Sequence, residues 1–269
     1  MVLKSYFDGG NQDDSSQYDT VSLACVAAID MDWQPFETAW RIMLQRYFGD
    51  SQEAYLHTVD AVTGNGVYEG WGVEKTQDFL SDCVQVALEY FIKAKKPEIG
   101  FQGQYGLYGC VITIVLKDFI EHTTANPNAP QNANEVLLRQ ALSLVLPWSQ
   151  LGADPPCDEC HCIFDQGEPF YGHLDDVMTR KKALQDATLL ARITSRTKAN
   201  MRRVPALQLA DLLAWSQTHK SDENKPEWHD SILKADFARE WFDRTTMKTL
   251  PDQQEIWKSW KVNRRRPTR

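Results

Sequence analysis

The 269-residue sequence lacks an apolar run long enough to cross a membrane, which takes about 20 residues. Its longest apolar stretch, GCVITIVLKDFI, is interrupted by Lys117. The sequence also lacks a signal-peptide pattern, because Lys4 follows Val2 and Leu3 before any apolar segment develops. We therefore expect a cytoplasmic protein that does not associate with membranes.

Cysteine is scarce, with six residues in the chain. Three of them are isolated in the sequence: Cys25, Cys83 and Cys110. In the reducing compartment that we expect, isolated cysteines remain free thiols. No cysteine and histidine stand in a pattern typical of nucleophilic catalysis, so covalent cysteine chemistry is not favoured.

The segment CDECHC brings the other cysteines close together, and its Cys-x2-Cys spacing is typical of zinc ligands. A structural zinc site needs a second pair of ligands, and the chain has no later cysteine. The histidines available to complete such a site are His173, His219 and His229. We favour free thiols over Zn²⁺ binding for the cysteines of this segment, which are Cys157, Cys160 and Cys162.

The net charge of −8 excludes a polycation, but the basic residues are concentrated in two segments. Residues 180–203 contain eight bases and one acid, and residues 258–269 contain six bases and no acid. This segregation is compatible with a local phosphate-binding face on an acidic body. The alternative is a solvent-exposed helix followed by a flexible basic tail.

Strand and helix patterns alternate along the chain without an internal repeat. The predicted strands cover residues 5–8, 19–30, 161–165 and 188–198, and a further strand leads into a helix within 98–122. The other predicted helices cover residues 34–48, 73–94, 135–151, 170–185 and 205–220. This order predicts an α/β domain with a mixed sheet over residues 1–222. We expect residues 223–269 to form a C-terminal helical extension with a basic tail, and its role as a lid, a docking helix or an oligomer contact stays open.

The first predicted strand ends in an acid, Asp8, which Gly9 and Gly10 follow directly. Asp-Gly after a strand is typical of a hairpin turn, so this segment alone predicts a turn residue. The segment HCIFD has the same form, with an aromatic residue before Asp165. Because ligands of open α/β sheets bind at the ends of strands, we expect Asp8 and Asp165 to face one crevice.

A third acid, Asp211, stands within PALQLADLLAW, a helical segment whose other residues are nearly all apolar. Such an acid lies either on a narrow exposed stripe with Gln208 and Trp215 or in the interior with a partner. A hydrogen-bonded structural role is the alternative to a role in a functional site.

Three converging carboxylates repel one another unless cations neutralise them. Mg²⁺ suits such a set because it prefers carboxylate, water and phosphate oxygens. Two such ions about 4 Å apart activate a water molecule and stabilise the leaving oxygen of a phosphodiester. The acids Asp8, Asp165 and Asp211, with the bases of RITSRTKANMRR close by in the sequence, therefore indicate metal-dependent phosphodiester chemistry.

Three segments, YFDGGNQD, CIFDQGEPF and PALQLADLLAW, resemble in this order the signature segments of the domain of unknown function 3800 family. The segment YLHTVDAVTGNGVYEGWGVEK also resembles that family's segment with a histidine before a Gly-Trp element. The resemblance covers most of the chain, from about Leu3 to Trp215. It implies a ribonuclease H-like fold, with a mixed five-stranded sheet, flanking helices, and acids on the first strand, the fourth strand and a late helix.

The resemblance also implies a set of site residues. By their positions in the matching segments, Asp8, Asp165 and Asp211 would bind Mg²⁺ or Mn²⁺. It adds Glu168, and His57 with Asp60, as further residues of the catalytic site.

Two departures from the family pattern weaken the expected metal site. The family's first segment often continues Asp-Glu-Ser, whereas two glycines follow Asp8 here, so a neighbouring carboxylate is missing. The acid that is usual on the first helix of ribonuclease H has no convincing counterpart in Glu37 or Glu53. A weak second metal site, or none, follows from these differences.

Two hypotheses for the function follow from the sequence. The first is a metal-dependent nuclease that hydrolyses DNA or RNA, and the three acids favour it. The second is a non-catalytic module that binds nucleic acid or protein on a ribonuclease H-like scaffold. The missing acid on the first helix and the acidic isoelectric point of about 5.3 favour this second hypothesis.

Overall fold

The computed structural model describes residues 2–10, 19–51, 53–91, 106–151, 157–181, 189–220, 225–235 and 237–247. The loop expected between the first two strands and the predicted basic tail lie outside these ranges. No helix within them is both long and apolar enough to cross a bilayer.

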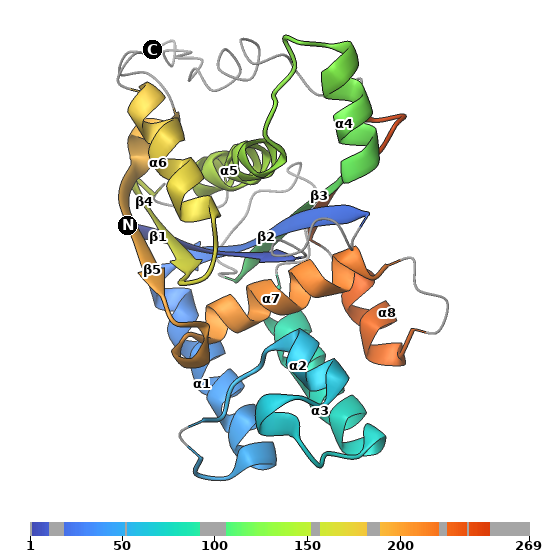
Figure 1. Ribbon diagram of the computed structural model, residues 1–269. Coiled ribbons are helices and arrows are strands. Elements are labelled where there is room, and N and C mark those ends of the chain that lie inside the picture. Colours follow the sequence, from blue (N-terminus) through green and yellow to red (C-terminus); the bar gives the residue numbers. More distant parts are fainter. Residues whose placement is uncertain are drawn as a thin grey trace.

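Six strands form one mixed sheet in the order β5-β4-β1-β2-β3-β6. They are β1 (Val2–Gly10), β2 (Thr20–Ile29), β3 (Tyr108–Val115), β4 (Glu159–Asp165), β5 (Ile193–Ala199) and β6 (Ala238–Phe242). β1, β2 and β3 are antiparallel neighbours, whereas β4 is parallel to β1, β5 to β4 and β6 to β3. The predicted α/β domain with a mixed sheet is confirmed (Figure 1).

The sheet has six strands and not the expected five, because the C-terminal part, expected to be helical, contributes a strand as well as a helix. This part contributes the short helix α8 (Glu227–Leu233) and then β6, which pairs with β3 from Cys110 to Ile114. The sequence of β6, AREWF, contains Ala, Arg and Glu, which favour helices. Pairing with a strand far earlier in the chain overrides this local preference.

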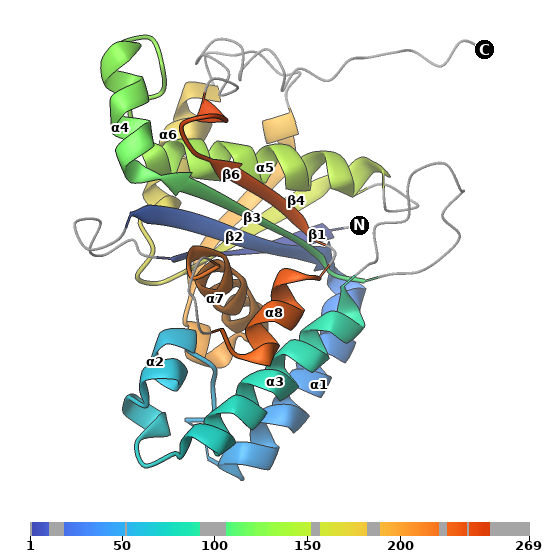
Figure 2. The same cartoon turned by 90° about the vertical axis from the view of Figure 1, so that its right-hand side faces the viewer.

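Helices cover both sides of the sheet (Figures 1 and 2). One side, here called the α5 face, is covered by α4 (Leu116–Ala125), α5 (Ala133–Leu151) and α6 (Phe170–Lys181). The core on this face is apolar and includes Phe7 and Phe164, whose rings stack with centroids 4.9 Å apart. This core stabilises the sheet through apolar burial.

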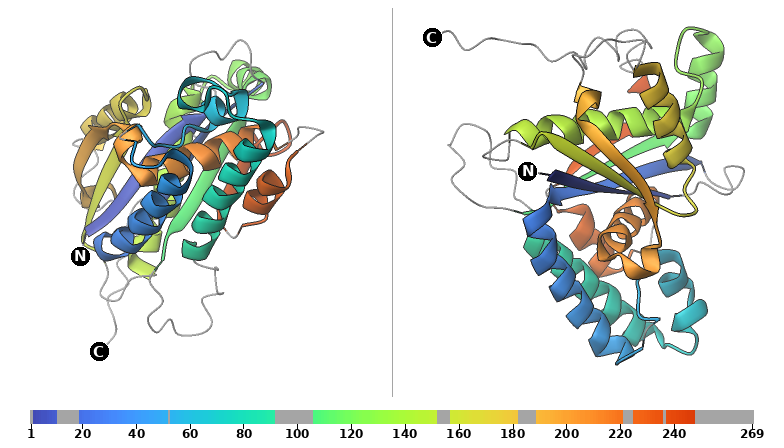
Figure 3. Two further views of the ribbon diagram at one scale, coloured as in Figure 1. Left: turned by 90° about the horizontal axis from the view of Figure 1, so that it is seen from below. Right: turned by 90° about the vertical axis from the view of Figure 1, so that its left-hand side faces the viewer.

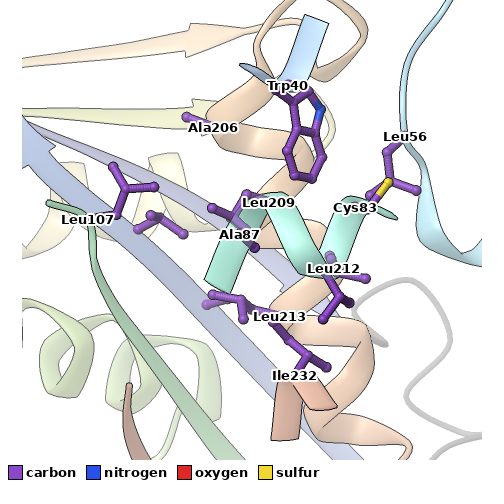
Figure 4. Close-up of a cluster of buried hydrophobic side chains, with 14 of the residues drawn as sticks. Trp40, Leu56, Cys83, Ala87, Leu107, Ala206, Leu209, Leu212, Leu213 and Ile232 are labelled. Atoms are coloured by element: carbon purple, nitrogen blue, oxygen red, sulfur yellow. The ribbon is translucent and has the colours of Figure 1, made fainter. Parts of the chain in front are cut away.

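The opposite side, here called the α7 face, is covered by α1 (Asp30–Phe48), α2 (Thr58–Thr63), α3 (Val73–Tyr90), α7 (Pro205–Thr218) and α8. One-turn helices occur at η1 (Gly66–Tyr68), η2 (Leu189–Arg192) and η3 (Met201–Arg203). α7 lies directly on β1 and β2, and α1, α2 and α8 pack against it (Figure 3). Twelve of its 14 residues are buried, so α7 is the central helix of this face. Figure 4 shows Leu209, Leu212 and Leu213 of α7 in the same cluster as Ala87 of α3 and Ile232 of α8.

β1 continues through Gly9 and Gly10, which pair with β2, so Asp8 lies inside the strand. The interpretation of Asp8 as a turn residue was therefore wrong. A Cβ atom on Gly10 would lie 2.8 Å from Ser22 Oγ and 3.4 Å from the carbonyl oxygen of Ala214 in α7. A glycine at this position allows α7 to approach the end of β1 closely.

Candidate active site

Asp8 and Asp165 lie on neighbouring strands, near the C-terminal end of each. β1 and β4 are parallel neighbours, and Phe7 pairs with Phe164 one position before the two acids. Because successive side chains of a strand point to opposite faces, the acids point away from the stacked phenylalanines and towards α7. The two acids therefore lie on the same face of neighbouring strands, and the crevice expected from the sequence stays a prediction.

Asp8 is buried, with 4% of its surface exposed. Burial raises the pKa of its carboxyl group well above the ordinary value, and the charges of Glu168, Asp211 and Asp165 raise it further. A hydrogen bond also joins the side chains of Asp8 and Glu168. This bond, like burial and the neighbouring charges, favours the protonated form of Asp8. These four residues are here called the acid cluster.

The turn after β4 brings Glu168 to Asp8 and holds Asp165 in place. The backbone N–H of Glu168 donates to the carbonyl oxygen of Asp165 at 3.2 Å. The Asp165 carboxylate accepts from two further backbone N–H groups, that of Met201 at 2.8 Å and that of Gly167 at 3.3 Å, one on each oxygen. Both carboxylate oxygens of Asp165 are therefore fixed by the backbone.

Asp211 is buried in α7 and binds the start of α2. Its Oδ2 accepts from the backbone N–H of Thr58 at 2.6 Å and from the Thr58 hydroxyl at 2.7 Å. Thr58 is the first residue of α2, so Asp211 satisfies a donor at the N-terminus of that helix. Burial raises the pKa of Asp211, and the opposing effects of His57 and of the two Thr58 bonds do not cancel the rise. Asp211 thus has a structural partner and also belongs to the acid cluster.

His57 directly precedes α2 and pairs with Asp60. Its Nδ1 lies 2.7 Å from Asp60 Oδ2, and both side chains are about one-third exposed. Burial lowers the pKa of His57, but the charges of Asp211, Asp60 and Asp165 together raise it above the ordinary value. Because an ionised carboxylate only accepts, Nδ1 carries a proton, and Nε2 is the atom that can exchange one.

Gln208 is a residue of the site whose role was not recognised from the sequence. It is 1% exposed, and its Oε1 accepts from Trp40 Nε1 at 2.8 Å and from the Leu56 backbone N–H at 3.0 Å. Its Nε2 donates to the Met201 carbonyl oxygen at 3.0 Å. Met201 holds Asp165, and Thr58, which follows Leu56 closely, holds Asp211. Gln208 therefore connects the two segments that hold these acids. An amide inside an apolar helix is the sequence signal for this role, because a buried amide needs partners.

The cysteines considered for zinc lie on the α5 face, away from the acid cluster. All three, Cys157, Cys160 and Cys162, are buried free thiols. Cys160 Sγ lies 3.6 Å from Ser5 Oγ, and a hydrogen bond with Cys162 lowers the pKa of Cys160. Two of the histidines considered as further ligands, His219 and His229, follow or lie in helices of the α7 face. The sheet therefore separates them from these thiols.

The acid cluster has the oxygen donors that Mg²⁺ and Mn²⁺ prefer. In the part of the chain that the structure describes, no three Asp, Glu, His or Cys side chains are arranged to hold a metal ion as they stand. Backbone donors stabilise the carboxyl groups of Asp165 and Asp211, and burial with the neighbouring acids raises the pKa of Asp8. The cluster fits a divalent cation in its chemistry, and binding one would favour the ionised form of Asp8, whose pKa is raised.

Comparisons with known proteins found no match. No family model, curated protein or solved structure matches this chain. The resemblance to the domain of unknown function 3800 family therefore stays a prediction from the sequence segments. A function for the acid cluster has to be argued from its geometry and chemistry.

Proposed function

We propose that this chain is a metal-dependent nuclease that hydrolyses phosphodiester bonds of DNA or RNA. The observation that carries the proposal is the acid cluster, in which the charges of three carboxyl groups act on the buried Asp8. Gathering several carboxyl groups in a buried place lowers stability, because like charges repel and burial disfavours ionisation. A bound divalent cation would offset both the repulsion and the cost of ionisation, so the cluster suits metal binding.

The order of the elements supports a ribonuclease H-like scaffold. The sequence resemblance implies a mixed five-stranded sheet with acids on the first strand, the fourth strand and a late helix. β1 to β5 form a mixed sheet, which β6 extends at one edge. Asp8, Asp165 and Asp211 lie on β1, β4 and α7.

Mg²⁺ or Mn²⁺ bound at the cluster would act as a Lewis acid, lowering the pKa of a bound water molecule and neutralising charge on the phosphate. Asp8, Asp165 and Asp211 would hold it, with Glu168 beside them. Because the pKa of Asp8 is raised, binding that ionises Asp8 would release a proton.

The residues around the cluster orient the acids and exchange protons. Thr58 fixes Asp211 through two hydrogen bonds, and backbone N–H groups fix both oxygens of Asp165, so little ordering remains for substrate binding. Asp60 holds His57 in one tautomer. With a raised pKa, His57 can donate a proton from Nε2 to a leaving oxygen.

Asp8→Asn tests the proposal by metal binding. We expect Mn²⁺ titration of the wild-type protein, followed by calorimetry, to show binding with release of a proton. The asparagine variant removes a charged ligand, so its Mn²⁺ affinity should fall at least about 100-fold. Metal-dependent cleavage of labelled DNA or RNA should be lost with it.

Asp78→Asn is the matched control, because Asp78 is an exposed acid on α3. It changes the net charge equally and should leave Mn²⁺ binding unchanged. Equal Mn²⁺ affinities for wild type, Asp8→Asn and Asp78→Asn would contradict the proposal.

The second hypothesis, a non-catalytic binding module, also has an observation in its favour. Asp165 and Asp211 already accept hydrogen bonds from the chain itself, as structural acids do. On this hypothesis, the wild-type protein binds no Mn²⁺ at the cluster and cleaves no nucleic acid, whatever residue stands at position 8.

A further inference from the structure

A basic residue, Arg202, directly follows the backbone segment that holds Asp165. It belongs to η3, which follows β5, and it comes directly after Met201, whose N–H holds Asp165. The backbone N–H of Arg202 donates to Asn200 Oδ1 at 2.9 Å, which fixes the chain at this turn. The position of Arg202 relative to Asp165 is therefore set by backbone hydrogen bonds.

The guanidinium group of Arg202 is held by an aromatic ring from the other side of the cluster. Its central carbon lies 5.0 Å from the ring centroid of Tyr55, a buried residue two positions before His57. The Tyr55 carbonyl oxygen accepts from the Tyr68 hydroxyl at 2.6 Å, which fixes this segment in turn. Arg202 thus bridges the segment that holds Asp165 and the segment that carries His57.

This contact leaves the donors of Arg202 available to a ligand. Arg202 is exposed, and among the residues whose placement is described no carboxylate pairs with its side chain. A guanidinium over an aromatic face keeps its N–H donors at its edge, where they match the oxygens of a phosphate.

The acid cluster repels any anion, so a phosphodiester that binds there needs positive charge on its other side. We propose that Arg202, held against Tyr55, binds a phosphate group of a nucleic-acid backbone at the rim of the acid cluster. This inference rests on the proposed nuclease function for its place in a reaction. The phosphate contact itself is independent of a metal ion.

The neighbouring bases contact other residues or lie on the other face of the sheet. Arg196 forms an ion pair with Asp175, and Lys198 lies 5.3 Å from the ring of Tyr171 on α6, on the α5 face. Arg203 is exposed like Arg202 but has no described aromatic contact. It is therefore a matched control with the same charge, one residue away.

The test is fluorescence anisotropy with short labelled single strands of DNA and RNA, in EDTA so that no metal contributes and no cleavage occurs. Arg202→Ala should lower the affinity about tenfold or more, since a hydrogen-bonded charge is lost. The slope of log affinity against log salt should fall by about 0.7, as for one phosphate contact with a single strand. Arg202→Lys should give an intermediate affinity, because lysine keeps the charge but not the planar fork.

Arg203→Ala should weaken binding less than about threefold, as expected for a diffuse effect of charge. Equal losses for Arg202→Ala and Arg203→Ala would overturn the inference, and so would a wild-type protein that binds neither strand. Binding of only DNA or only RNA supports the phosphate site and identifies the polymer.

Calorimetry with Mn²⁺ separates this inference from the proposed function, because Arg202→Ala should bind the metal as wild type does. If Asp8→Asn leaves Mn²⁺ binding unchanged while Arg202→Ala alone weakens strand binding, the nuclease proposal fails and the phosphate site stands. If Mn²⁺ binding depends on Asp8 but the two arginine variants behave alike, the phosphate site fails alone.

Discussion

The two faces of the sheet are built from the same strands but bury different chemistry. On the α5 face, β1 and β4 present Phe7 and Phe164 to an apolar core. One position further along, the same strands present Asp8 and Asp165 to α7, a helix with buried amide and carboxyl groups. Both faces contain an apolar core, but on the α7 face the buried acids lower the stability that this core provides.

Adjacent residues of one strand can therefore belong to an apolar core on one face of the sheet and to a charged site on the other face. Apolar rings and thiols on the α5 face need only close packing. The buried Asp211 and Gln208 of the site on the α7 face have specific partners, Asp211 in Thr58 and Gln208 in Trp40. Substitutions on the α5 face should therefore change stability alone, whereas polar substitutions on the α7 face should change stability and metal binding separately.

The largest expected effect on stability is that of Phe164→Ala on the α5 face. It removes a fully buried ring that stacks on Phe7, and loss of such a ring costs about 3–5 kcal/mol of unfolding free energy. Urea denaturation measures the loss, and Ile120→Ala, at a residue 61% exposed, is the control that should change little. A lowered Mn²⁺ affinity of the folded Phe164→Ala protein would break the separation between the faces.

Gln208→Leu should have the next largest effect, about 2–4 kcal/mol, because it leaves Trp40 Nε1, the Leu56 N–H and the Met201 carbonyl without their partner. Unlike Phe164→Ala, it should also weaken Mn²⁺ binding, since Gln208 connects the segments that hold the acids. Urea denaturation and calorimetry on the folded variant measure the two effects.

Gln217→Leu is the control for Gln208→Leu. Gln217 is buried in the same helix, and its Oε1 has no hydrogen-bond partner among the residues that the structure describes. Its replacement should cost less than about 1 kcal/mol and leave metal binding unchanged. Similar results for the two variants would mean that the hydrogen bonds of Gln208 do not organise the site.

Asp8→Asn should stabilise the metal-free protein at pH 8 by about 1 kcal/mol, because it replaces a buried acid that is disfavoured when ionised. The pKa of Asp8 lies well above 3.8 in the folded state, so the folded protein holds this proton more tightly than the unfolded chain does. The contribution of Asp8 to stability is therefore full below pH 3.8 and is lost as the pH rises through the folded pKa.

Urea denaturation of wild type and Asp8→Asn at several pH values isolates this contribution. The stability advantage of the variant should grow from acid to alkaline pH in EDTA, and Mn²⁺ should reverse it by stabilising the wild type alone. If the variant is less stable than wild type at pH 8 in EDTA, Asp8 is a structural acid that stabilises the fold.

Much of the fold and the principal acids could be predicted from the sequence because the signals are local. Strand and helix patterns repeat with their own periods, and in both strands an aromatic residue directly precedes the acid, Asp8 or Asp165. Asp211 was recognisable because a buried acid inside an apolar helix requires a hydrogen-bond or charge partner. These features depend on residues that are neighbours in the chain.

The features that were missed depend on contacts between distant parts of the chain. Asp-Gly favours a turn, but pairing with β2 extends β1 to Gly10. The β6 segment favours a helix by its composition, but pairing with β3 makes it a strand. The role of Gln208 depends on α1, η3 and the segment before α2, which only folding brings together.

The smallest expected effect on stability is that of His57→Gln, which tests the edge of the α7 face rather than its interior. The pair with Asp60 is about one-third exposed, so it contributes less than about 1 kcal/mol. The pKa of His57 is raised, so this contribution is present below its ordinary pKa of 6.5 and is lost as the pH rises through the folded value. Urea denaturation should find the variant slightly less stable than wild type at pH 6 and equal to it at pH 9. Asp60→Asn should show the same pH dependence, because it removes the other half of the pair. If both variants are destabilised equally at pH 6 and pH 9, His57 acts there by packing, and its charge is not part of the site.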